Sequence, residues 1–411
     1  MSKVFLGLTN ISSQIPDLAH GYQANGVGAI TAVYSNHHPP IINNNVDYDL
    51  SIYFRSWTRF IRPRRFRNMF HNMLSSAKAY KKFVFNKAVK ECEIFHFMWN
   101  TFSSGFYDLR YLKQLNKKIV VQFVGGEVRW KNAMEQEFDS YSLHPVEYDS
   151  DYDSSSSALE AKLAFIRRVE KYADLVFASP SACQLSLRPY IINHHFLRLS
   201  DFVENTHQRH IPHIIHSPSN KHFKGTKYFI QSIDKLKHDV DFTFELLDNI
   251  PYSDAKLAYT NADILLGQLF VPGGGKQEKE ALASGCVVLT NKNTTYRPDL
   301  LNSPIIDINI DNLTCVLRDI IEDHAKRQLL SEYGRRYVEQ YSTADRLCKK
   351  IIDYFSGAYT FKETIPLFFH NHYIPESTQY AEIYNKWTKY VSKTVWYKNH
   401  INSICRDGLI F

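Results

Sequence analysis

Short apolar runs alternate with longer amphipathic stretches along most of this chain of 411 residues. Short apolar runs bounded by turn residues are typical of buried strands, and amphipathic stretches of about ten or more residues are typical of helices. In the first half the expected strands are residues 3–8, 29–34, 94–97, 118–123 and 175–178, and the expected helices include 14–25, 68–91 and 158–173. Strands that alternate with helices form parallel sheets with helices on both faces, so the pattern predicts an α/β fold.

The second half repeats the alternation. Its expected strands are residues 213–216, 242–247, 264–268, 287–290 and 305–308, and its expected helices are 226–237, 253–261, 277–284 and 313–341. We therefore expect two Rossmann-like, doubly wound domains that face each other across a cleft, at residues 1–200 and 201–355, with a connector near 198–212. The tail at 356–411 is rich in Tyr, Trp and Lys, and we expect it to form helices that pack back on the body.

Composition excludes several classes of protein. The chain is 44% hydrophobic and 22% charged, which is ordinary for a globular protein and excludes wholesale disorder. No run of 18 apolar residues occurs and the N-terminus lacks the features of a signal peptide, so we expect a cytoplasmic protein. The six cysteines lie far apart without zinc spacing, so neither a metal site nor a disulfide framework is expected.

The first segment that carries chemistry lies where the strand at 213–216 ends and the helix at 226–237 starts. It contains Lys221, Lys224 and Gly225. The free N–H groups of a helix start, a glycine that permits close approach and two positive charges suit an anionic diphosphate. An ordinary surface turn with solvated lysines is the alternative.

The second segment follows the strand at 264–268. Three glycines, Gly273, Gly274 and Gly275, lead into a short helix that carries Glu280. Successive glycines can turn their N–H groups inward as an anion-binding nest, and the carboxylate of Glu280 can accept both hydroxyls of a ribose. A plain loop and a solvated helix carboxylate are the alternative.

Together these segments resemble the nucleotide-sugar domain of retaining glycosyltransferases of the GT-B fold, family 4 in particular. The resemblance rests on Lys224-Gly225, on Ala262-Asp263, and on Glu280-Ala-Leu-Ala-Ser-Gly-Cys-Val-Val288. In the first half, Phe95-His96-Phe97 and the turn Gly125-Gly-Glu127-Val-Arg129 resemble the branch that makes bacterial surface polysaccharides. The resemblance covers roughly residues 90–355.

This resemblance implies transfer of a sugar from a UDP- or GDP-linked donor to a glycan or lipid-linked glycan acceptor, with retention and without a metal. It makes Lys224, Glu280 and His96 the catalytic candidates, and it places Lys224, Lys221, Gly225 and the glycines 273–275 at the diphosphate and Glu280 at the ribose. His96, Glu127 and Arg129 are placed on the acceptor side, and for His96 a buried, hydrogen-bonded histidine is the alternative. Pro272 stands where the family has a further carboxylate. A nucleotide-sugar epimerase of the same fold and a non-catalytic GT-B scaffold therefore stay open as alternatives.

Two charged stretches stand apart from these motifs. Residues 51–90 hold eleven Lys and Arg and no acid, in a chain of net charge +7. We rank an anionic membrane surface or lipid-linked acceptor first for this stretch, a solvated face second and nucleic acid last. Residues 135–157 hold seven acids and a serine tract, which predicts a mobile loop, and the Asp-x-Asp pattern at 149–153 within it is not expected to bind metal.

Overall fold

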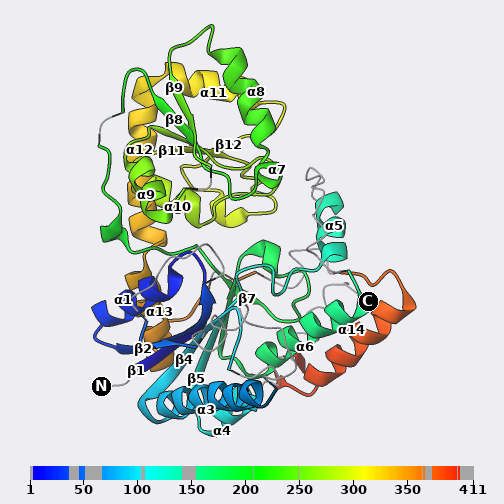
Figure 1. The fold of residues 1–411 in the computed structure, drawn as a ribbon. Coiled ribbons are helices and arrows are strands. Elements are labelled where there is room, and N and C mark those ends of the chain that lie inside the picture. The colour runs from blue at the N-terminus through cyan, green and yellow to red at the C-terminus, as the bar shows by residue number, and fades with distance from the viewer. Residues whose placement is uncertain are drawn as a thin grey trace. The chain divides into compact units, whose positions relative to one another are not determined.

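The computed structural model describes residues 3–36, 46–50, 67–102, 107–140, 154–206, 208–248, 250–362, 364–365, 373–395 and 397–398 (Figure 1). Internal contacts divide the chain into two compact units. Unit 1 comprises residues 1–130, 155–193 and 348–411, and unit 2 comprises residues 131–154 and 194–347.

Unit 1 is built on a sheet whose strand order is β13-β7-β6-β5-β4-β1-β2-β3. The strands are β1 (Lys3–Asn10), β2 (Gly28–Asn36), β3 (Tyr48–Asp49), β4 (Cys92–Met98), β5 (Lys118–Gln122), β6 (Leu175–Ala178), β7 (Tyr190–Ile192) and β13 (Thr364–Ile365). All neighbours pair in parallel except β13, which runs antiparallel to β7. Apart from the two outer strands at the β7 end, this is the strand order of a Rossmann fold, with its order reversing between β1 and β4.

The helices of unit 1 include one long basic helix and two that lie against each other. They are α1 (Gln14–Ala24), α3 (Arg67–Glu91), α4 (Tyr107–Gln114), α6 (Ser156–Tyr172) and α14 (Thr378–Val391). Figure 1 shows α14 alongside α6, and the two helices are in contact. A further helix, α13 (Ala344–Ser356), begins in unit 2 and continues into unit 1.

Unit 2 has a fully parallel sheet with the order β12-β11-β10-β8-β9. Its strands are β8 (His213–His216), β9 (Thr243–Leu246), β10 (Ile264–Leu266), β11 (Val287–Thr290) and β12 (Ile306–Asp307). Numbered along the chain, the order is 2-1-3-4-5, so the direction of strand addition reverses between β8 and β10. In open α/β sheets ligands bind at such a reversal, outside the carboxyl ends of the strands.

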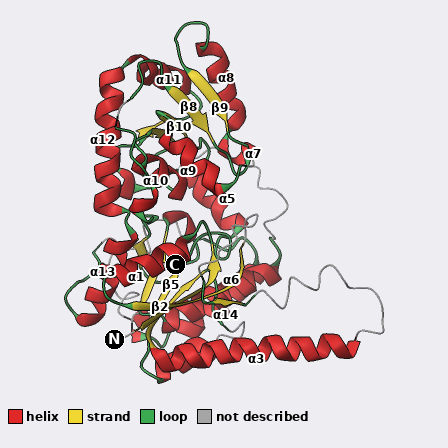
Figure 2. Cartoon of the chain, turned by 60° about the vertical axis from the view of Figure 1, so that its left-hand side comes forward, coloured by secondary structure: helices red, strands yellow, loops and turns green. Residues whose placement is uncertain are grey.

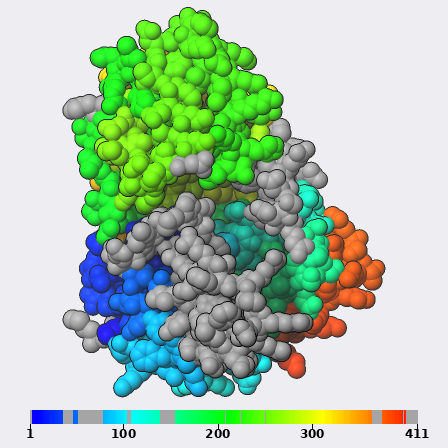
Figure 3. All heavy atoms as spheres, viewed as in Figure 1, coloured from blue at the N-terminus to red at the C-terminus, as the bar shows by residue number. Residues whose placement is uncertain are grey.

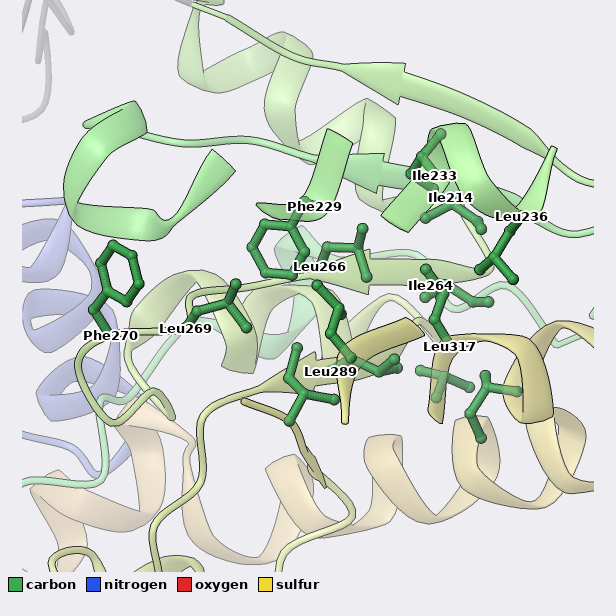
Figure 4. Close-up of a cluster of buried hydrophobic side chains, with 14 of the residues drawn as sticks. Ile214, Phe229, Ile233, Leu236, Ile264, Leu266, Leu269, Phe270, Leu289 and Leu317 are labelled. Atoms are coloured by element: carbon green, nitrogen blue, oxygen red, sulfur yellow. The ribbon is translucent and has the colours of Figure 1, made fainter. Parts of the chain in front are cut away.

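Helices cover both faces of this sheet (Figure 2). They are α7 (Lys221–Lys224), α8 (Thr226–Leu236), α9 (Tyr252–Thr260), α10 (Lys276–Ala283), α11 (Leu313–Glu322) and α12 (His324–Tyr341), and α5 (Lys131–Ser140) belongs to the same unit. On one face Ile214, Ile264 and Leu289 pack with residues of α8 and α11 (Figure 4). On the other face Ile215 and Leu265 pack with residues of α9, α10 and α12. Successive strand residues point to opposite faces, so strands buried on both sides must be apolar throughout.

The sequence-based elements are largely confirmed, with two corrections. The expected helix at 313–341 is wrong as a single helix, because it breaks at Asp323, whose side chain accepts from the N–H of Lys326 and caps α12. The expected loop from residue 135 is wrong at its start, because α5 continues to Ser140. The rest of that acidic stretch up to 153, including the Asp-x-Asp pattern, lies outside the described residues, as does the basic stretch at 51–66.

Among the helices in the described ranges, none is long and apolar enough to cross a membrane.

Candidate functional site

The candidate donor site lies at the carboxyl ends of β8 and β10, on both sides of the reversal in strand order. β8 leads through a short loop into α7 and α8, and β10 leads through the glycine run into α10. Both expected anion-binding segments therefore follow the two strands at which this fold class binds ligands.

The lysine segment has the geometry that the sequence predicts. Gly225 separates α7 from α8 with a φ of +77°, a left-handed conformation that favours glycine. A Cβ atom added there would lie 3.1 Å from the side chain of Leu269. Gly225 thus brings the chain close to the segment that follows β10.

Lys224 is the last residue of α7, and its side chain contacts the first turn of α10. Its ammonium donates to Oε1 of Gln277 over 2.8 Å, and Nε2 of Gln277 donates to the carbonyl of Ser217 over 2.7 Å. Gln277 is the second residue of α10, and Ser217 directly follows β8. This amide bridge joins the two segments, and it places one positive charge beside the positive end of the α10 dipole, where an anion is favoured.

The glycine run is fixed by contacts on its far side. The N–H of Gly273 donates to the carbonyl of Asn291, so it is already used. Gly274 has a φ of +82°, and an added Cβ would lie 2.7 Å from Leu300. The backbone N–H groups that remain candidates for binding an anion are therefore those of Gly274, Gly275 and the first turn of α10.

A buried ion pair holds the same run. Arg297 is 4% exposed, binds Asp299 through two N–H groups, and donates a further N–H to the carbonyl of Gly273 over 2.7 Å. The neighbouring guanidinium outweighs burial and lowers the pKa of Asp299 to about 2. The pair is thus ionised at neutral pH, and the guanidinium fixes the position of the glycine run.

Glu280 is buried on α10 with partners from two helices. Its Oε1 accepts from the hydroxyl of Tyr252 over 2.6 Å and lies 4.0 Å from the ammonium of Lys276. Glu278, two residues earlier, is 2% exposed, and its Oε1 has no hydrogen-bond partner among the described residues. That oxygen lies 3.1 Å from the position of an added Cβ on Gly267, at the end of β10.

Lys221 points elsewhere. Its ammonium pairs with Asp248, which follows β9, over 2.6 Å, with both side chains partly exposed. Exposed pairs of this kind contribute little to stability, so the pair can open without much cost.

His96 lies inside unit 1. It is 1% exposed on β4, and its Nδ1 is 3.2 Å from the hydroxyl of Tyr22. Burial lowers the pKa of His96 to about 3. The histidine is therefore neutral at physiological pH and is part of the packed interior.

Glu127 and Arg129 shape the turn after β5. The carboxylate of Glu127 accepts from the N–H groups of Val124 and Gly125, and burial raises its pKa to about 7. Arg129 donates to the side chain and carbonyl of Ser181. The turn is thus tied to the segment after β6, at the carboxyl ends of two neighbouring strands.

Sequence reasoning missed Gln277, Arg297 and Glu278 as site residues. Gln277 and Glu278 lie in the first turn of α10, the helix on which the sequence already placed Glu280 as a site residue. The first turn is where a helix offers its free N–H groups. Arg297 belongs to Arg-Pro-Asp in the loop after β11, and no local pattern connects it to Gly273.

A buried lysine beside this site predicts a pH effect on stability. Lys279 is 1% exposed, with its ammonium 4.4 Å from the ring centre of Tyr337, and burial and then Arg297 lower its pKa to about 7. The unfolded chain binds more protons than the folded one between about pH 7 and 10.5, so the stability of the wild type should rise with pH across that window. Lys279→Met should raise the free energy of unfolding at pH 6 by on the order of 1 kcal/mol or more and remove this slope.

Chemical denaturation at pH 6, 8 and 9.5 measures this effect. Lys227→Met, on the exposed start of α8, is the matched control and should leave the slope unchanged. A Lys279→Met protein that is less stable than the wild type at pH 6 would contradict the assignment.

Comparisons with known proteins bear on the fold. No protein-family model and no curated protein matches the chain. Among solved structures, sucrose-phosphate synthase from Thermosynechococcus elongatus matches with a TM-score of 0.56 and 12% identity over 87% of this chain and 99% of that one. HepE from Anabaena, in complex with UDP and glucose, matches with a TM-score of 0.50 and 12% identity over 87% of this chain and 100% of that one. The likeness shows that the chain has the GT-B fold, with two Rossmann-like domains.

Proposed function

We propose that the protein is a glycosyltransferase that binds a nucleoside-diphosphate sugar on unit 2. The observation that carries the proposal is the bridge from Lys224 through Gln277 to Ser217. It brings a lysine and a helix start together at the reversal of strand order, which is where a diphosphate is best stabilised. The fold shared with sucrose-phosphate synthase and with UDP-bound HepE supports this chemistry.

In this proposal Lys224 and the amides of Gly274 and Gly275 hold the diphosphate. They neutralise the charge that grows on the leaving group as the bond to the sugar breaks, and such stabilisation is usually the largest catalytic term. Lys221 joins them when its surface pair with Asp248 opens. The carboxylate of Glu280 accepts hydrogen bonds from the ribose hydroxyls, and Tyr252 and Lys276 hold this carboxylate in place.

Unit 1 takes the acceptor in this proposal. Glu127 and Arg129 lie in the turn after the carboxyl end of β5, and Arg129 binds Ser181 after β6, so they are the acceptor-side candidates. The burial of His96 argues for a packing role. The sequence resemblance supports family 4, retention of configuration, no required metal, and a role in bacterial surface polysaccharide synthesis. We also propose a cytoplasmic enzyme whose basic stretch at 55–90 contacts an anionic membrane surface, because that stretch holds eleven Lys and Arg and no acid.

The Glu280→Gln variant tests the ribose assignment. It keeps the shape of the side chain but removes the charge, so UDP affinity should fall by about 10- to 100-fold because charge-assisted hydrogen bonds to the ribose are lost. Calorimetry with UDP and with 2′,3′-dideoxy-UDP makes the test specific: the wild type should prefer UDP, and the variant should not. Glu322→Gln, at the exposed end of α11, is the control. An unchanged preference for UDP in Glu280→Gln would remove Glu280 from the ribose site.

Simple assays distinguish this proposal from its two alternatives, an epimerase and a non-catalytic scaffold. Calorimetry with a panel of UDP-, GDP- and CMP-sugars identifies a donor, and incubation without acceptor then reveals an epimerase by conversion of that donor. A non-catalytic scaffold, which Pro272 in place of a carboxylate favours, should bind donor weakly or not at all. Glu278 is the acid nearest to Pro272 in the sequence, and its buried carboxylate lies beside the glycine run, so it is the candidate to replace the missing carboxylate.

A further inference from the structure

Unit 1 carries a surface pocket of about 300 Å³ between α4, α6 and α14. Four of its lining side chains are aromatic and three are basic: Tyr107, Tyr172, Trp387 and Tyr390, and Arg110, Arg168 and Lys386. Figure 3 shows the α14 segment, in red and orange, at the surface. None of the proposed donor-site residues lies on these helices.

The wall formed by α14 is held in place by packing. Tyr384 of α14 is 8% exposed, and its ring centre lies 5.5 Å from the guanidinium carbon of the fully buried Arg167 of α6. Lys386 forms an ion pair with Glu160, again between α14 and α6. The pocket therefore exists before any ligand arrives, which reduces the entropic cost of binding.

The pocket combines positive charge with flat apolar faces. Arg168 lies 5.3 Å from the ring centre of Trp387, and Lys171 lies 4.0 Å from that of Tyr390. A guanidinium stacked on an aromatic ring keeps its N–H groups in its own plane, where they suit a planar carboxylate. Burial and a hydrogen bond with Tyr172 raise the pKa of Tyr390 to about 12, so its phenol stays a neutral hydroxyl.

We propose that this pocket binds a sugar residue that carries a carboxylate, as part of the acceptor glycan; the acceptor role rests on the proposed function. Aromatic faces pack against the C–H face of a sugar ring, phenol hydroxyls exchange hydrogen bonds with its hydroxyl groups, and the two arginines of the pocket take the carboxylate, because Lys386 is already paired with Glu160. The volume suits a ligand of one or two rings, at the lower end for small-molecule sites. A nucleic-acid strand needs a groove that follows several phosphates, and a membrane needs a broad basic face. A pocket of about 300 Å³ provides neither, so we favour a sugar as its ligand.

Calorimetry on the full chain with trigalacturonate tests the proposal, with its neutral methyl ester as the matched ligand. The wild type should bind the acid and bind the ester at least about tenfold more weakly. Arg110→Ser, on the exposed face of α4, should weaken binding of the acid by about tenfold or more, and Trp387→Leu should weaken both ligands. Lys389→Ser, an exposed lysine of α14 outside the pocket, is the control and should bind as the wild type does.

Three outcomes would overturn the proposal. They are no binding of trigalacturonate at millimolar concentration, equal affinity for the acid and the ester, and unchanged binding by Arg110→Ser. Co-sedimentation with phosphatidylglycerol vesicles that Arg110→Ser abolishes, without saccharide binding, would assign the pocket to a lipid instead. The titration contains no nucleotide, so it remains decisive even if unit 2 binds no donor.

Discussion

The Lys224→Ala variant is expected to lose sugar transfer by at least about 100-fold while unfolding at the same temperature as the wild type. Removing one group that stabilises charge in the transition state typically costs about 10²–10³ in rate. The ammonium is half-buried and bonded to Gln277, so little folding free energy depends on it. Steady-state kinetics with the donor identified by calorimetry, together with thermal denaturation, measures both quantities.

One control and one further variant of the site accompany this experiment. Lys227→Ala removes an exposed positive charge near Lys224 and should retain wild-type turnover. Gln277→Glu keeps an acceptor for Lys224 but loses the N–H donor to Ser217 and adds a negative charge at the helix start, so it should weaken diphosphate binding. Wild-type turnover in Lys224→Ala would dismiss the diphosphate assignment.

Arg297→Met should lower the free energy of unfolding by about 3–5 kcal/mol and also weaken donor binding. Breaking one partner of a buried pair leaves an uncompensated charge, here the carboxylate of Asp299. In the wild type the lowered pKa of Asp299 contributes stability that is fully present above about pH 4 and is lost as the pH falls toward 2. The variant should lack this acid-side loss, which chemical denaturation from pH 2 to 6 measures.

A double variant separates stability from positioning. Arg297→Met combined with Asp299→Leu removes both charges, so most of the lost stability should return. Donor affinity should remain weak, because no side chain then holds the carbonyl of Gly273. Recovery of donor affinity together with stability would show that the contact between Arg297 and Gly273 has no positioning role.

The core of both sheets was predictable from the sequence because burial on two faces forces continuous apolar strands. The strands at 213–216 and 287–290 were predicted to the residue for this reason. The break at Asp323 was not, because the amphipathic pattern continues across it and the break depends on a local capping bond. The folded tail was expected, but its partner α6 lies more than 200 residues earlier in the chain, and no local pattern selects that partner.

The candidate site was predictable only as far as its motifs reach. The positive φ of Gly225 and the helix start after the glycine run follow from residue type and spacing. In the bridge through Gln277, the hydrogen bond from Gln277 to Ser217 joins residues that are 60 positions apart in the sequence. The contact of Arg297 with Gly273 spans 24 positions. Such contacts depend on the register of the folded sheet, so only the structure shows them.

A crystal structure of the protein soaked with UDP-glucose decides whether unit 2 holds the donor as proposed. Diphosphate oxygens are expected within hydrogen-bond distance of the Lys224 ammonium and of the amides of Gly274 and Gly275, with the ribose at Glu280. Nucleotide density at any other place on unit 2, or a pyrophosphate without contact to Lys224 and α10, would contradict it.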